Sequence, residues 1–118
     1  MRNTNNHSEQ CCKQSFGKCE GVCRTYSALQ SAYAQKLQDN DSIVSFKCNI
    51  PLEGIDIFGG SYTTDFYAVK TNDDIMIREC IEIDDLMKLK NAKLMDQSRC
   101  YWLKRGITDW GIVTSAEE

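Results

Sequence analysis

Residues 62–83 read YTTDFYAVKTNDDIMIRECIEI and contain two alternating runs on either side of a polar turn. Side chains in a strand point alternately to opposite faces, and β-branched and aromatic residues of the kind found in both runs favour strands. The triplet Asn72-Asp73-Asp74 is typical of a tight turn between paired strands. The sequence therefore predicts a β-hairpin with strands over Tyr62–Lys70 and Ile75–Ile83.

The segment before this hairpin predicts one helix and one further strand. Apolar residues recur every three or four positions over Tyr26–Gln38, which is the period of an amphipathic helix. Alternation over Ile43–Ile50 then predicts a strand, and Pro51 opens the loop that leads to the hairpin. The three consecutive strands can pair as an antiparallel meander.

The segment after the hairpin predicts a helical crossover and a last strand. The helix begins at Leu86 or Asn91 and ends at Arg105, because Gly106 favours a helix end. Alternation over Thr108–Thr114 predicts a strand that lies parallel to its neighbour, since a helix precedes it. The predicted fold class is α/β (α+β), a mixed sheet of about four strands in the order helix, three strands, helix, strand.

Composition and charge limit the classes of function. The chain has 118 residues, of which 42% are hydrophobic and 26% charged, with a net charge of −3. Residues 1–24 are expected to form a polar, cysteine-containing tail before a single domain over residues 25–118. Neither a secretory signal nor an apolar run of about 20 residues is present, so we expect a cytoplasmic chain with no membrane partner. An acidic balance excludes binding to nucleic acid through bulk charge alone.

Two carboxylates stand out on the predicted hairpin. Glu79 shares one strand face with four isoleucines, at positions 75, 77, 81 and 83. A carboxylate buried there costs several kcal/mol unless it is paired, protonated or bound to a cation, and a position at the rim of the sheet is the alternative. Asp65 lies about as far from the turn on the other strand, so the two acids can approach each other. Paired carboxylates suit Mg²⁺ or Mn²⁺.

The two strands resemble the PD-(D/E)xK nuclease core, which places an Asp on one strand and an acid, any residue and a Lys on the next. The corresponding triplets are Thr64-Asp65-Phe66 and Glu79-Cys80-Ile81. Roughly residues 26–114 are also similar to the TnsA family of transposase endonucleases. The segments that carry this resemblance are Ser27-Ala28-Leu29-Gln30, Ile43-Val44-Ser45-Phe46, Tyr62-Thr63-Thr64-Asp65-Phe66, KLMDQSRCYW (residues 93–102) and GITDWGIVT (residues 106–114).

The resemblance implies a restriction-endonuclease-like domain over residues 25–118 that cleaves a DNA strand at the ends of a mobile element. It implies Mg²⁺ or Mn²⁺ as the cofactor, held by Asp65, Glu79 and Gln30. It also implies DNA and other transposase subunits as partners. The DNA-interacting C-terminal region of longer members of the family is not matched.

Two departures from the family pattern weaken the expected site. Gln30 stands where the family usually has a Glu, and Ile81 stands where a Lys would stabilise charge on the phosphate. Lys88, Lys90 and Lys93 follow nearby as candidate substitutes for this Lys, and Lys93 is the first choice because its segment resembles the family. The alternative role of Lys93 is a solvated charge on a helix. The expected function is therefore a weakened metal-dependent endonuclease. Two alternatives stay open: a catalytically degenerate nuclease fold that binds DNA or protein, and a small, for instance phage-borne, regulatory protein.

The seven cysteines allow a second kind of site. We expect no disulfides, because the count is odd and a cytoplasmic chain is kept reduced. Thiolates can ligate zinc, although the spacing is not a paired C-x₂-C arrangement. The candidates for zinc are Cys11, Cys12, Cys19 and Cys23. The remaining three, Cys48, Cys80 and Cys100, are expected to pack as small apolar side chains.

Overall fold

The structure is a computed structural model that describes residues 12–53 and 62–115. Its elements in chain order are β1 (Cys12–Gln14), β2 (Cys23–Thr25), α2 (Ala28–Asp39), β3 (Ile43–Pro51), β4 (Thr63–Lys70), β5 (Ile75–Cys80), α3 (Ile83–Leu86), α4 (Leu89–Leu103) and β6 (Asp109–Val113). None of these helices is long and apolar enough to cross a membrane.

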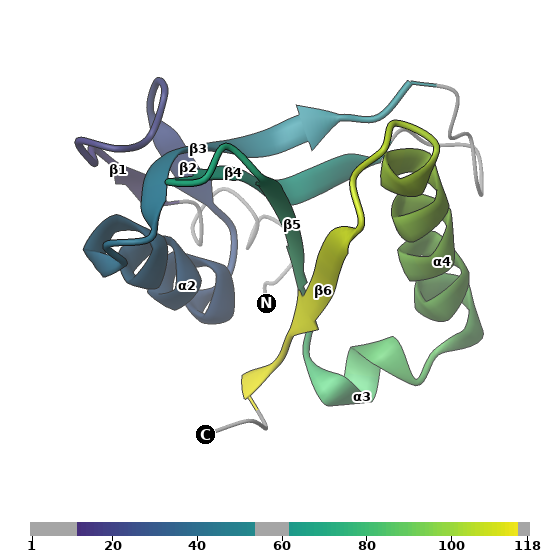
Figure 1. Ribbon diagram of the computed structural model, residues 1–118. Coiled ribbons are helices and arrows are strands. Elements are labelled where there is room, and N and C mark those ends of the chain that lie inside the picture. Colours follow the sequence, from purple (N-terminus) through teal and green to yellow (C-terminus); the bar gives the residue numbers. More distant parts are fainter. Residues whose placement is uncertain (1–11, 54–61, 116–118) are drawn as a thin grey trace, which may run out of the picture.

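The predicted mixed sheet is present, with four strands in the order β3-β4-β5-β6 (Figure 1). The first three strands form an antiparallel meander, and β6 runs parallel to β5 after the crossover through α3 and α4. At the predicted turn, Asp73 has a positive φ of 71°, and the Lys70 amide donates to the Asp74 carbonyl at 2.8 Å. The hairpin, the meander and the parallel last strand are therefore confirmed.

The crossover differs from its prediction in two respects. The strand expected to reach Ile83 ends at Cys80, because Ile83 begins α3. Asp84 and Asp85 lie in the first turn of this helix, where negative charge is favourable. Two helices also replace the single one expected, since the chain bends at Met87 and Lys88 before α4. The helix α4 ends at Leu103, two residues before the expected Arg105, and Gly106 follows it with a φ of 83°.

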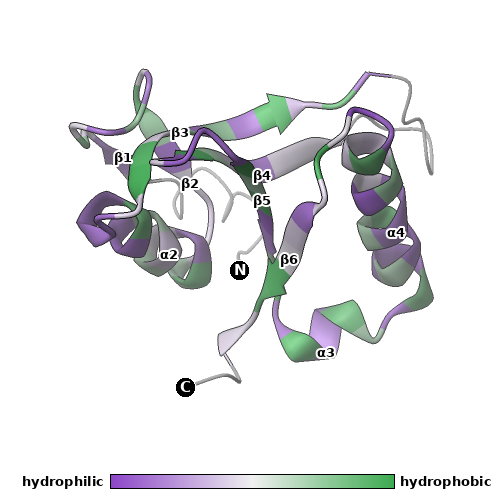
Figure 2. Cartoon of the chain, in the orientation of Figure 1, coloured by the Kyte–Doolittle hydropathy of each residue, from purple (hydrophilic) through white to green (hydrophobic). Residues whose placement is uncertain are grey.

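Two apolar clusters lie on opposite faces of the sheet. On one face, Ala34 and Leu37 of α2 pack against Phe46 and Phe66, which are buried on β3 and β4. On the other face, Trp102 of α4 packs against Ile77 and its partly buried neighbours. Hydrophobic and hydrophilic residues alternate along the strands and around both long helices in Figure 2. The sheet is thus covered by one long helix on each side (Figure 1).

Within the polar tail expected over residues 1–24, residues 1–11 lie outside the described residues, and residues 12–25 form a small hairpin of β1 and β2 that packs on the core. Backbone hydrogen bonds join this segment to β3, from the Phe46 amide to the Lys18 carbonyl and from the Glu20 amide to the Phe46 carbonyl, both at 2.9 Å. Cys19, Cys23 and Thr25 supply its buried side chains. Two three-residue strands are too short to show a period in the sequence, which explains the difference.

Candidate metal centre

Asp65 and Glu79 lie on neighbouring strands at the point where β4 and β5 separate. The last ladder pair is Phe66 with Arg78, and the two acids follow it. The Asp65 amide donates to Oε1 of Glu79 at 2.9 Å, and the Cys80 amide donates to Oδ2 of Asp65 at 2.7 Å. Each carboxylate therefore accepts a backbone N–H from the opposite strand and replaces a lost ladder bond.

Glu79 is only 1% exposed and is held by two hydroxyl groups. Its Oε2 accepts hydrogen bonds from Oγ of Ser98 at 2.6 Å and from Oγ1 of Thr64 at 2.9 Å. Each hydroxyl oxygen in turn accepts an indole N–H, from Trp110 at Ser98 and from Trp102 at Thr64. Because an indole N–H is only a donor, it orients each hydroxyl hydrogen toward Glu79, which is therefore bonded as a carboxylate.

The surroundings act on the proton affinity of both acids. Burial and, after it, the Glu79 charge raise the pKa of Asp65 to about 7, although the hydrogen bond from Cys80 opposes the shift. Burial also raises the pKa of Glu79, although its hydrogen bonds from Ser98, Asp65 and Thr64 oppose that shift. Burial, together with the two carboxylate charges, holds the pKa of the Tyr62 phenol well above its usual range. The two carboxylates and this phenol therefore share one desolvated site.

Gln30 lies beside Asp65, but it presents a nitrogen rather than an oxygen. Its Oε1 accepts the Tyr26 amide at 2.8 Å, while its Nε2 donates to Oδ1 of Asn49 at 3.3 Å and to Oδ1 of Asp65 at 3.4 Å. A role as an oxygen ligand would require the amide group to turn over and the bond to Tyr26 to break. Gln30 thus contacts Asp65 as a hydrogen-bond donor.

The structure does not bring Lys93 to the acids. Lys93 is exposed on α4, and Ser98, which does face Glu79, lies five residues later and roughly 140° around the helix. Among the contacts between described residues, none joins Lys93 to Asp65 or Glu79. Ile81 follows β5 as an apolar residue whose amide donates to the Val113 carbonyl at 3.0 Å.

The donor chemistry of the centre fits a hard divalent cation at Asp65 better than at Glu79. Asp65 is half-buried, and each of its oxygens accepts one hydrogen bond, so a lone pair on each oxygen is free for a ligand. Glu79 accepts three hydrogen bonds, two of them at Oε2, and it is only 1% exposed, so it is less accessible to a cation than Asp65. Mg²⁺ commonly binds through one or two carboxylates and keeps several waters, so Asp65 as first ligand meets its requirements.

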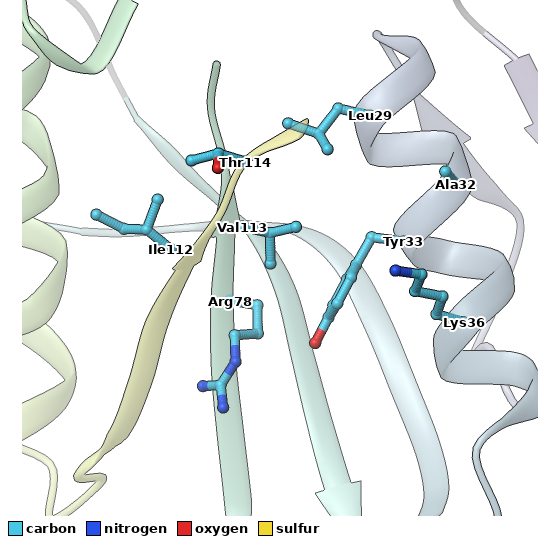
Figure 3. A pocket seen from close by; sticks show the side chains of 8 residues that line it. All are labelled: Leu29, Ala32, Tyr33, Lys36, Arg78, Ile112, Val113 and Thr114. Carbon is cyan, nitrogen blue, oxygen red and sulfur yellow. The ribbon is translucent and has the colours of Figure 1, made fainter. Parts of the chain in front are cut away.

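A separate cleft of about 290 Å³ lies between α2 and β6 (Figure 3). Its lining includes Tyr33, Lys36 and Arg78 but neither of the two acids. The Arg78 guanidinium is bound by the Asp109 carboxylate at 2.8 Å and by the Ile77 carbonyl at 2.8 Å. The charge of Arg78 therefore anchors β6 to β5, and the cleft has no part in the carboxylate centre.

Ser98 and Thr64 are the site residues that sequence reasoning missed. Ser98 lies on the inner face of α4 between the buried residues Met95 and Trp102. A buried hydroxyl on the apolar face of a helix needs a hydrogen-bond partner. The position of Ser98 on that face is therefore the signal in the sequence that could have identified it. No family model matches the chain, and no curated protein matches it significantly.

Proposed function

We propose that the chain is a weakly active, metal-dependent DNA endonuclease, of the kind that serves as the strand-cleaving subunit of a two-component transposase. The observation that carries the proposal is the contact between Asp65 and Glu79, two desolvated acids on adjacent strands with Gln30 beside them. A four-stranded mixed sheet covered by a helix on each face is compatible with a restriction-endonuclease-like fold.

In this proposal Asp65 holds Mg²⁺ or Mn²⁺ from the half-buried side of the centre, and Glu79 supports it from the buried side. When bound there, Mg²⁺ or Mn²⁺ would supply polarisation of the phosphate and a lowered pKa for an attacking water. Thr64 and Ser98 fix the position of the Glu79 carboxylate. Ile81 offers no charge to the phosphate, and the loss of one such stabiliser typically lowers a rate about 10²–10³-fold, so we expect slow cleavage.

A second candidate function is a catalytically degenerate module that binds DNA or a transposase subunit. The observation in its favour is that all four carboxylate oxygens of Asp65 and Glu79 already accept hydrogen bonds from the protein. Such a network can stabilise the sheet without any cation. The exposed position of Lys93 and the apolar Ile81 agree with this alternative.

Asp65→Asn is expected to abolish Mn²⁺-dependent nicking of supercoiled DNA, while the wild type nicks it slowly. The change removes the charge that holds the cation and leaves a side chain of the same shape. The matched control is Asp84→Asn, which removes an exposed acid on α3 and should nick as the wild type does. Equal nicking by wild type and Asp65→Asn would place the activity outside this centre, and no nicking by the wild type would favour the degenerate module.

Joint restoration of the family residues, Ile81→Lys with Gln30→Glu, is expected to raise the nicking rate about 10²–10³-fold over the wild type. The lysine supplies charge at the phosphate, and the glutamate adds a third carboxylate to the centre. Lys93→Ala should leave the rate unchanged, because Lys93 is exposed on α4. The rates are compared by single-turnover cleavage of a labelled duplex. A strong loss in Lys93→Ala would show that this lysine moves to the centre when DNA binds.

A further inference from the structure

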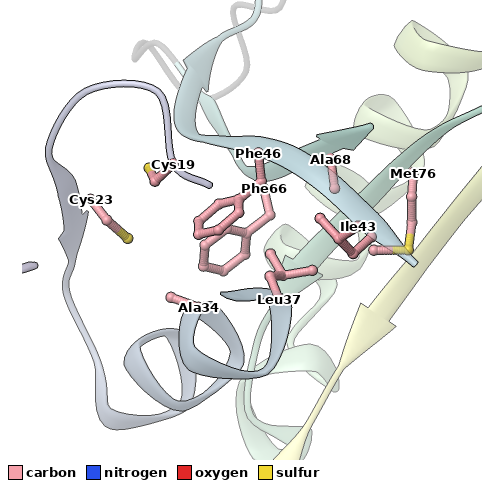
Figure 4. Packing of buried hydrophobic residues seen from close by; sticks show 9 residues of the cluster. All are labelled: Cys19, Cys23, Ala34, Leu37, Ile43, Phe46, Phe66, Ala68 and Met76. Carbon is pink, nitrogen blue, oxygen red and sulfur yellow. The ribbon is translucent and has the colours of Figure 1, made fainter. Parts of the chain in front are cut away.

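Three thiols from separate parts of the chain converge at the N-terminal edge of the larger apolar cluster. The Sγ atom of Cys48 lies 3.0 Å from that of Cys23 and 3.9 Å from that of Cys19, and all three lie within 4.8 Å of one another. Figure 4 shows Cys19 and Cys23 on the N-terminal segment, beside the rings of Phe46 and Phe66. Cys48 comes from β3, so the cluster joins the small hairpin to the main sheet.

We infer that Cys19, Cys23 and Cys48 bind a zinc ion that fastens the β1–β2 hairpin to β3. These three ligands are not the same set as the four cysteines expected from the sequence. Cys48 replaces a ligand from the tail, while Cys11 and the side chain of Cys12 lie outside the described residues. The inference does not depend on the proposed nuclease activity, because it concerns thiols rather than the carboxylates of Asp65 and Glu79.

The three sulfurs lie close enough together to share one ion. Thiolates bound to zinc at about 2.3 Å in a tetrahedron lie about 3.8 Å apart, so the Cys19–Cys48 separation of 3.9 Å fits, while the Cys23 and Cys48 sulfurs, at 3.0 Å, have to move apart to bind the ion. A disulfide would use only two of the sulfurs and leave the third thiol buried beside it. The convergence of three sulfurs therefore favours a soft cation over a bond between two of them.

The local backbone suits a zinc-binding turn. Cys19 and Cys23 have three residues between them, a spacing found in structural zinc sites. Gly21 has a φ of 81° with open space around it, so the chain reverses tightly between the two thiols. On the other side of the cluster, Asn49 has a φ of 58° and its Nδ2 donates to the Arg24 carbonyl at 2.8 Å. This bond holds Cys48 and Cys23 next to each other.

The test is the metal content of the full-length wild type, purified under reducing conditions without added metal. We expect about one zinc ion per chain by elemental mass spectrometry. After exchange for Co²⁺, we expect a thiolate-to-cobalt charge-transfer band and strong visible bands typical of tetrahedral cobalt. A wild type without zinc and without these bands would overturn the inference, and so would a disulfide between Cys23 and Cys48 that forms whether or not zinc is supplied.

Single variants identify the ligands. Cys19→Ser, Cys23→Ser and Cys48→Ser should each weaken zinc binding more than about 100-fold, because changes to residues that only support zinc ligands already cost about 10–100-fold. Cys100→Ser, which alters a half-buried thiol outside the cluster, should bind zinc as the wild type does. Equal binding by Cys48→Ser and Cys100→Ser would contradict the inference. The cobalt spectrum of the wild type decides the matter even if a variant fails to fold.

Discussion

Trp102→Ala is expected to lower the free energy of unfolding by about 3–5 kcal/mol, the usual cost of removing a buried Trp. The side chain is 5% exposed, and its ring centroid lies 5.0 Å from that of Tyr101 and 5.6 Å from that of Tyr67. The substitution also removes the indole donor that orients the Thr64 hydroxyl toward Glu79. Urea unfolding followed by circular dichroism measures the loss.

Two further variants separate the causes of this loss. Trp102→Phe keeps most of the ring contacts and loses the hydrogen bond to Thr64, so it should cost only about 1–2 kcal/mol. Leu103→Ala alters the next residue on α4, which is 49% exposed, and should cost less than about 1 kcal/mol. If Trp102→Ala costs no more than Leu103→Ala, the ring is not part of the core.

Between about pH 4 and about pH 8, the unfolding free energy of Asp65→Asn is expected to rise by about 4 kcal/mol relative to that of the wild type, in buffer without added Mg²⁺ or Mn²⁺. The pKa of Asp65 rises from 3.8 to about 7 on folding, chiefly through burial. Stability from its protonated form is therefore present in full below about pH 4 and is lost as the pH rises to about 7. Because Asn cannot ionise, the variant does not lose this stability, and its free energy of unfolding rises relative to that of the wild type over this range.

The measurement is the difference in unfolding free energy between Asp65→Asn and wild type, at intervals from about pH 4 to about pH 8. Taking the difference removes the contribution of groups that titrate alike in both proteins, the three clustered thiols included. Saturating Mn²⁺ at about pH 8 should shrink the difference if the cation binds Asp65. A difference that stays constant with pH would mean that Asp65 keeps an ordinary pKa in the folded protein.

The sheet was predictable from the sequence because its signals are long and local. The alternation of Tyr62–Lys70 and Ile75–Ile83 and the Asn72-Asp73-Asp74 turn specify the central hairpin. The small hairpin of β1 and β2 was not predictable, because its stability comes from contacts of Cys19 and Cys23 with Phe46 and Cys48, which lie far away in the sequence.

For the carboxylate centre, the sequence predicts which residues lie near each other but not how their atoms are oriented. Equal distance from the turn was enough to place Asp65 opposite Glu79, and the resemblance placed Gln30 nearby. Which atoms face each other depends on side-chain geometry, so the amide orientation of Gln30 and the contact of Ser98 with Glu79 could not be read from the sequence. Lys93 is the candidate lysine because its segment resembles the family, and the helical rotation of α4 separates it from Ser98.

The parallel pairing of β6 with β5 sets the order in which a nascent chain can complete its fold. Residues 109–113 are synthesised after every other strand of the sheet, and they pair with Met76–Cys80. Until they leave the ribosomal exit tunnel, β5 has one bare edge, and the Ser98 hydroxyl beside Glu79 lacks the indole of Trp110. An apolar strand with a bare edge is a target for chaperones and for wrong pairing between chains. We therefore expect the nascent protein to be most vulnerable after β5 has left the exit tunnel and before β6 has followed it.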